Sequence, residues 1–156
     1  MPNPDRMTGA CPRIIAFLVL MLALPAVGRA ADPAPPVTVD VGIVLASQEG
    51  ATVDPALSSI QGKLRSMFNY TSYRMLERKQ RSLHVGELWE YDLPGNRTMR
   101  VTPSPSRGTK VRLAVEIREG GKNLLATTLG LSRGGMVLVG GPPYRKGVLI
   151  LIISAE

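Results

Sequence analysis

Three acidic residues, Glu87, Glu90 and Asp92, lie close together in the middle of the chain. Glu90 and Asp92 alternate with Trp89 and Tyr91, so in an extended strand both carboxylates point to one side, about 7 Å apart. Glycoside hydrolases use two carboxylates at a separation not far from this. The spacing is compatible with a small carboxylate-dependent hydrolase, although alternation alone also places polar residues on the outer face of a strand.

Other residue types offer little for catalysis. His84 is the only histidine and Cys11 the only cysteine, which leaves too few ligands for an ordinary zinc or copper site. The chain contains no G-x-x-x-x-G-K-[ST] phosphate loop, and Gly120-Gly121 is better explained as a hairpin turn. We therefore expect a non-enzymatic protein with no catalytic set, no metal and no cofactor, in which His84 is a solvated strand residue.

The densest positive run contains Arg74, Arg78, Lys79 and Arg81. Such a run can contact lipid head groups or anionic wall polymers. It can also be a strand edge that is kept basic to prevent edge-to-edge pairing. No nucleic-acid-binding motif accompanies it, so nucleic acid is not an expected partner.

A second candidate binding segment spans residues 140–147, with the sequence GGPPYRKG. It places Tyr144, Arg145 and Lys146 between two apolar segments. We predict a loop there that contacts a partner or an anionic ligand, with an ordinary long turn as the alternative.

Residues 1–30 have the pattern of a secretory signal peptide. Arg6 and Arg13 supply positive charge, residues 14–27 form an apolar stretch, and small residues precede a cleavage point after Ala30. The expected product is periplasmic or extracellular, with no stable membrane span after processing; an uncleaved N-terminal anchor is the alternative. Cleavage would remove Cys11 and leave 16 basic and 11 acidic residues, a net charge of +5. The exported product would then be held together by its core alone.

The remaining chain has the size and composition of one domain. With 156 residues, 44% of them apolar, it can form a core, which excludes wholesale disorder and a multi-domain enzyme. Residues 31–36 (ADPAPP) are predicted to be a proline-rich leader. The domain proper, residues 37–156, begins with alternating apolar residues at 37–46 that predict a half-buried strand.

A helix and then about eight short strands are expected after this strand. Asp54 and Pro55 are typical of a helix start, and apolar residues at three- and four-residue spacing predict a helix over residues 55–68. The unbroken apolar run at 148–153 (VLILII) predicts a central strand covered on both faces. The fold class is therefore α+β, a mostly antiparallel, strongly curved sheet or small sandwich with one covering helix. The other predicted strands are 71–77, 82–85, 88–93, 97–102, 110–118, 123–131 and 136–139.

Residues 125–141 (LATTLGLSRGGMVLVGG) resemble the strand, glycine turn, strand and GG element of bacterial secretins. The chain as a whole is similar to short, uncharacterised exported bacterial β-rich proteins. These resemblances imply a cell-envelope setting.

The leading hypothesis is an exported, non-enzymatic β-rich module that binds another envelope component, either a protein or an anionic polymer. Sheet edges or residues 140–147 would make the contact. The alternatives are an accessory subunit of a secretion or pilus assembly and the small carboxylate-dependent hydrolase.

Overall fold

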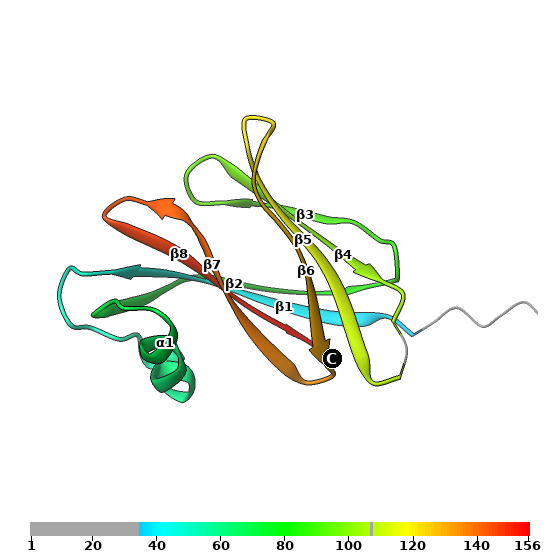
Figure 1. The fold of residues 1–156 in the computed structure, drawn as a ribbon, viewed down its shortest axis with the longest axis horizontal. Coiled ribbons are helices and arrows are strands. Elements are labelled where there is room, and N and C mark those ends of the chain that lie inside the picture. The colour runs from blue at the N-terminus through cyan, green and yellow to red at the C-terminus, as the bar shows by residue number, and fades with distance from the viewer. Residues whose placement is uncertain (1–34, 107) are drawn as a thin grey trace, which may run out of the picture. The chain divides into compact units, whose positions relative to one another are not determined.

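The computed structural model describes residues 35–106 and 108–156, and these residues form one compact unit. The predicted signal peptide lies outside the described residues. Elements follow one another as shown in Figure 1. In chain order they are β1 (Val37–Ser47), the 3₁₀ helix η1 (Pro55–Ile60), α1 (Gln61–Met67), β2 (Ser72–Leu83), β3 (Trp89–Leu93), β4 (Arg97–Ser104), β5 (Lys110–Glu119), β6 (Lys122–Ser132), β7 (Gly135–Tyr144) and β8 (Gly147–Ala155).

The strands of the described residues form two four-stranded antiparallel sheets. Sheet A has the order β2-β1-β8-β7, and sheet B has the order β3-β4-β5-β6. Successive strands are neighbours except at β2–β3 and β6–β7, where the chain passes from one sheet to the other. The last strand, β8, pairs with β1 over Val39–Ala155 to Ser47–Gly147. The prediction of a mostly antiparallel β fold with one helical segment is confirmed, and that segment is short.

The main core lies between the two sheets, and period-two alternation builds it. Trp89, Tyr91 and Leu93 are buried while Glu90 and Asp92 between them are exposed. The buried residues of β1, β5 and β8 that join this core are Val37, Val39, Val41, Ile43, Val111, Leu113, Val115, Ile117, Leu149, Leu151, Ile153 and Ala155. Burial of this apolar surface is the main source of the domain's stability.

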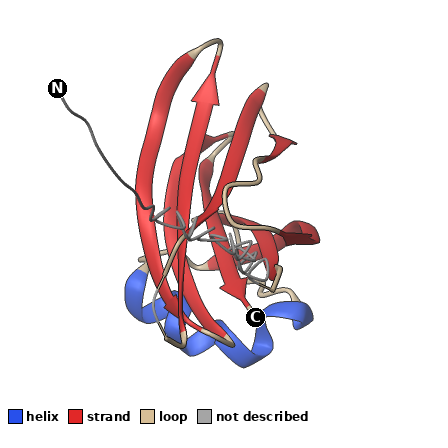
Figure 2. Ribbon diagram, turned by 90° about the vertical axis from the view of Figure 1, so that its right-hand side faces the viewer, coloured by secondary structure: helices blue, strands red, loops and turns tan. Residues whose placement is uncertain are grey.

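The helical segment covers the other face of sheet A. Leu57 and Leu64 are fully buried against Ile150 and Ile152 of β8. Tyr73 of β2 is buried beside them, and its hydroxyl donates a hydrogen bond of 2.6 Å to the Phe68 carbonyl. Figure 2 shows the helical residues gathered toward one end of the long strands. As predicted, β8 is therefore covered on both faces.

Three local predictions were wrong. The expected helix 55–68 is a 3₁₀ turn followed by a short α-helix, and Met67 is 54% exposed rather than packed. Residues 72–77 and 82–83 belong to one strand, β2, where two strands (71–77 and 82–85) were predicted, because β1 supplies a continuous partner for the polar residues between them. This strand ends at Leu83, so His84 lies in the following loop, outside any strand.

The segment 140–147 is mostly strand. Strand β7 continues through both prolines to Tyr144, with an irregularity between Gly140 and Pro143, and the predicted long loop shrinks to a two-residue turn. Proline is tolerated in β7 because it is an edge strand. Within the described residues, neither helical segment has the length and apolar character needed to cross a membrane.

Candidate functional site

Of the three acidic residues that could serve a hydrolase, two lie on the exposed face of β3 and one lies in a loop. Glu90 Oε2 lies 2.8 Å from Arg100 Nε on the outer face of sheet B. Glu87 lies in the loop after β2, where it accepts hydrogen bonds from the His84 backbone N–H at 3.0 Å and from Arg81 at 3.2 Å. Asp92 is exposed. Two carboxylates that face each other across a cleft are what glycoside hydrolysis needs, and this arrangement does not provide them.

The hydrogen bond from His84 has an electrostatic consequence for Glu87. This bond, with smaller contributions from the His84 side chain and Arg81, holds the pKa of Glu87 below its ordinary value. Because the folded pKa is lowered, the stabilising contribution is present above the unfolded pKa and is lost as pH falls through the folded pKa.

We expect the carboxyl carbon of Glu87 to titrate below pH 4.5 in an NMR pH series. Glu87→Gln should also flatten the fall in unfolding free energy between neutral and acid pH, measured by urea denaturation. An unshifted titration midpoint would contradict the prediction, and Glu116→Gln, on the outer face of sheet B, provides a control with the same charge change.

The basic run is divided between the two faces of β2. Arg78 points toward the helix side and pairs with Asp40 at 2.9 Å, and the hydrogen bond to Asp40 raises the pKa of Arg78. Lys79 points the other way, since successive strand residues alternate. The structure therefore does not gather the run into one patch.

The side chains of Lys79 and Arg81 both have interaction partners where the chain passes from β2 to β3. The Lys79 ammonium lies 3.0 Å from Glu77 and 5.1 Å from the centre of the Tyr91 ring. Burial, with a smaller effect from Glu77, raises the pKa of Tyr91, whose hydroxyl contacts Met99 Sδ at 3.1 Å. Arg81 is the residue paired with Glu87. Of these contacts, the one between Lys79 and Tyr91 joins β2 to β3, and the one between Arg81 and Glu87 joins β2 to the loop that follows it.

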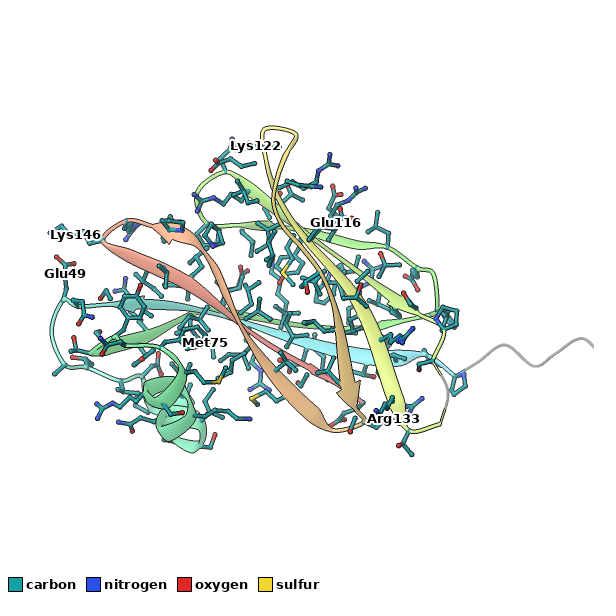
Figure 3. The ribbon with its side chains drawn as sticks, viewed as in Figure 1. Glu49, Met75, Glu116, Lys122, Arg133 and Lys146 are labelled. Carbon is teal, nitrogen blue, oxygen red and sulfur yellow. The ribbon has the colours of Figure 1, made fainter. Side chains whose placement is uncertain are left out.

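The predicted residues Tyr144, Arg145 and Lys146 lie at the turn between β7 and β8. Arg145 has a positive φ of 50° and stacks 5.3 Å from the Tyr144 ring. Lys146 Nζ bonds Glu49 at 2.7 Å, and this bond raises the pKa of Lys146. Figure 3 shows Lys146 and Glu49 side by side at one end of the domain.

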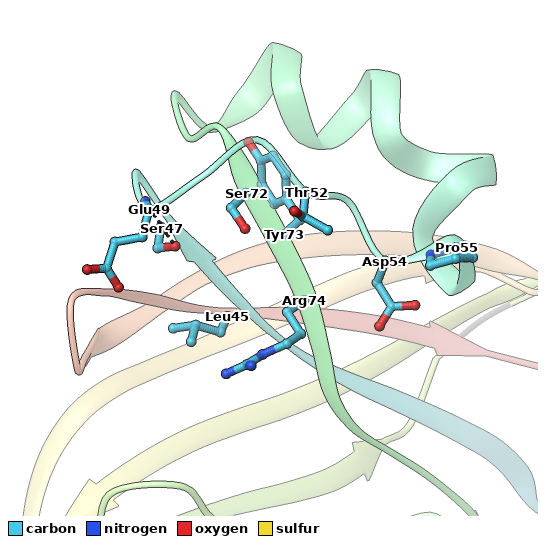
Figure 4. A pocket seen from close by; sticks show the side chains of 9 residues that line it. All are labelled: Leu45, Ser47, Glu49, Thr52, Asp54, Pro55, Ser72, Tyr73 and Arg74. Carbon is cyan, nitrogen blue, oxygen red and sulfur yellow. Dashed lines mark hydrogen bonds between the residues drawn. The ribbon is translucent and has the colours of Figure 1, made fainter.

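A hollow of about 480 Å³ lies near this turn, at the ends of β1 and β2. Figure 4 shows Leu45 and Arg74 extending from the strands beneath the loop that carries Asp54. Backbone hydrogen bonds of 2.9 Å between Tyr73 and residues 52–54 hold this loop against β2. The hollow brings Arg74 into the neighbourhood of Glu49 and Lys146, but its mixed charges favour no single class of ligand.

The sheet edges differ in how they are protected against pairing. Within the described residues each sheet has two edge strands: β2 and β7 in sheet A, β3 and β6 in sheet B. Strand β2 is highly charged, β7 contains Pro142 and Pro143, and β3 has only five residues. Charge, proline and short length are the usual protections of an edge. Strand β6 carries one charge, Lys122 at its first residue, and its remaining residues, 123–132 (NLLATTLGLS), contain no charge and no proline.

A groove follows the unprotected edge. Strands β6 and β7 leave a common turn at Arg133–Gly134 and diverge, as Figure 1 shows. Between them lies a hollow of about 440 Å³. Its β6 side is formed by Leu124 and Leu125, which are half-buried against the main core. At its end the Arg97 guanidinium donates a hydrogen bond of 2.9 Å to the Pro143 carbonyl.

The described part of the chain is a mostly antiparallel β protein of two four-stranded sheets, with a short helical segment and an open sheet edge at β6. No protein-family model and no curated protein matches the chain. Among residues 35–106 and 108–156, no three His, Cys, Asp or Glu side chains are grouped as metal ligands. Sequence analysis missed the β6 edge, although the absence of charge and proline over residues 123–132 was a readable signal.

Proposed function

We propose that the mature chain is an exported, non-enzymatic module that binds an extended segment of another cell-envelope protein along the edge of β6. The single observation that carries the proposal is the unprotected character of this strand. It is eleven residues long, lies at the edge of sheet B, and has no charge from Asn123 to Ser132. An edge of this kind is a template for pairing with another strand.

The hydrogen-bonding pattern of β6 indicates what kind of partner segment could pair with it. Alternate residues of β6 direct their N–H and C=O groups toward β5, and the residues between them direct theirs outward. An added strand supplies the missing hydrogen bonds, while every second side chain can reach the groove beside Leu124 and Leu125. We therefore expect a partner segment with apolar residues at alternate positions.

This arrangement supports a protein partner over an anionic polymer at the β6 edge, because that strand carries no cation between Asn123 and Ser132. The exposure of Glu90 and Asp92 on an outer sheet face, with Glu90 paired to Arg100, also favours binding over the hydrolase alternative. The secretion-assembly alternative draws on a different observation, since the secretin-like residues 125–141 make up most of β6 and β7. Under that alternative the bound segment belongs to a secretion or pilus component.

Photo-crosslinking in intact cells tests the proposal. A photoreactive amino acid at Ala126, which is exposed on β6, should trap one protein, and mass spectrometry should locate the crosslink in an extended segment of it. The same group at Asp92, on the opposite edge of sheet B, is the control and should not trap that protein. Equal trapping at both positions would contradict the proposal.

Two neighbouring proline variants make the test sharper. In Thr127→Pro and Thr128→Pro, one proline removes an N–H that pairs with β5 and the other removes an N–H on the open edge. The variant that keeps its thermal stability should lose the crosslink from Ala126. If that folded variant is still crosslinked as efficiently as the original chain, strand pairing at β6 is wrong.

A further inference from the structure

A second hollow, of about 560 Å³, lies on the outer face of sheet B, away from the groove between β6 and β7. It is lined by Pro105, Ser106, Lys110, Arg112 and Gly130. Both charged side chains in this lining are cations, and both are exposed. A hollow lined by two cations and no carboxylate is suited to an anion.

Strand register explains why the hollow exists. Lys110 and Arg112 are two residues apart on β5, so their side chains leave the same face of the sheet. Gly130 of β6 lies directly opposite Arg112, and Lys110 lies opposite Ser132. A Cβ atom built on Gly130 would meet no atom within 4 Å, so the sheet surface is open there.

The cations of this hollow differ from four of the basic residues discussed above. Arg78, Arg81, Arg97 and Lys146 have carboxylate partners at 2.7 to 3.2 Å, whereas within the described part of the chain Lys110 and Arg112 have none within 4.0 Å. On their own face of β5 the next acidic residue is Glu116, roughly 13 Å along the strand from Arg112.

Arg133 adds to the positive charge. Its backbone N–H donates to the Thr109 carbonyl at 3.0 Å, which fixes this exposed residue beside the start of β5. Figure 3 places Arg133 far from Lys146 and Glu49, and far from Lys122 at the tip of the β5–β6 hairpin. The hollow is therefore separate from the turn at Tyr144.

We infer that this hollow binds a phosphate group, held between the Lys110 ammonium and the Arg112 guanidinium over the bare backbone of Gly130. Arginine pairs with phosphate through two parallel N–H donors, and lysine binds it as a compact point charge. Gly130 lets the anion approach the sheet because no side chain stands in the way. The site is independent of pairing at the β6 edge and takes a different class of ligand.

The test uses two phosphate sources: inorganic phosphate, and vesicles of phosphatidylglycerol compared with vesicles of phosphatidylcholine. Binding is followed from the amide NMR signals of Arg112 and Gly130, or by co-sedimentation with the vesicles. Inorganic phosphate that saturates these shifts supports a site for soluble phosphate. Sedimentation with phosphatidylglycerol vesicles alone supports a site for lipid head groups. Binding in either form should weaken with salt.

Two variants and a control distinguish binding at this site from nonspecific electrostatic attraction of phosphate to the basic domain. Lys110→Gln with Arg112→Gln should weaken binding about ten-fold or more, because charge-assisted hydrogen bonds are lost. Gly130→Val fills the hollow without changing charge and should also weaken binding. Lys122→Gln with Arg145→Gln removes the same charge elsewhere and should not. The inference is overturned if neither source binds, if the control weakens binding equally, or if both site variants bind as the original chain does.

Discussion

Replacing Gly147 by alanine should destabilise the domain by about 3 kcal/mol or more, since the new methyl group has no room. A Cβ atom at Gly147 would lie 2.0 Å from the carbonyl oxygen of Ala46 and 3.1 Å from Cβ of Ser47. Gly147 pairs with Ser47 at the end of the β1–β8 ladder, where both strands are part of sheet A. Backbone must move to admit the methyl group, so the register of the two central strands is disturbed. Urea denaturation measures the effect.

Gly130→Ala is the matched control, because Gly130 is also a strand glycine but has open space around its Cβ position. Alanine there should raise stability by about 0.5 kcal/mol, as expected from the greater backbone entropy of glycine in the unfolded chain. The two substitutions add the same methyl group and should act in opposite directions. A Gly147→Ala protein as stable as the original would mean that β1 and β8 are farther apart than described.

Much of the fold could be predicted because its strands carry the alternation of a half-buried sheet. Trp89, Tyr91 and Leu93 had to share one face, and the structure buries all three. Gly120 and Gly121 were expected to turn the chain, and both have positive φ in the tight turn between β5 and β6. The errors lie where long-range partners override local pattern. The polar residues 78–81 were predicted to separate two strands, but pairing with β1 keeps them extended within β2.

The sites were harder to predict, because sequence neighbours in a strand point to opposite faces and their partners come from distant strands. Arg78 and Arg81 are close together in sequence, yet Arg78 pairs with Asp40 and Arg81 pairs with Glu87. Conversely, the pairing of Arg112 with Gly130 depends on the register of β5 and β6, which no local pattern specifies in advance. Edge position is likewise a property of strand order, so the importance of the uncharged β6 sequence emerges only with the sheet.

Shortening a buried side chain on either face of β8 should lower the stability of the domain by the same amount. In this respect β8 differs from a strand that has one solvated face. Leu151 is fully buried between the sheets, and Ile150 is fully buried against the helical segment. Leu151→Ala and Ile150→Ala should each cost about 3 kcal/mol, from lost transfer energy and the cavity left behind. Guanidinium or urea denaturation of the two variants measures the cost.

Strand β5 supplies the comparison for this prediction. Leu113 is fully buried while the neighbouring Arg112 is exposed on the outer face. Leu113→Ala should cost about 3 kcal/mol, whereas Arg112→Ala should stay within about 0.5 kcal/mol of the original chain. If Ile150→Ala were as mild as Arg112→Ala, the helical segment would not cover β8 in solution. Its residues would then be free to leave sheet A, and Ile150 and Ile152 would form a second open surface besides the β6 edge.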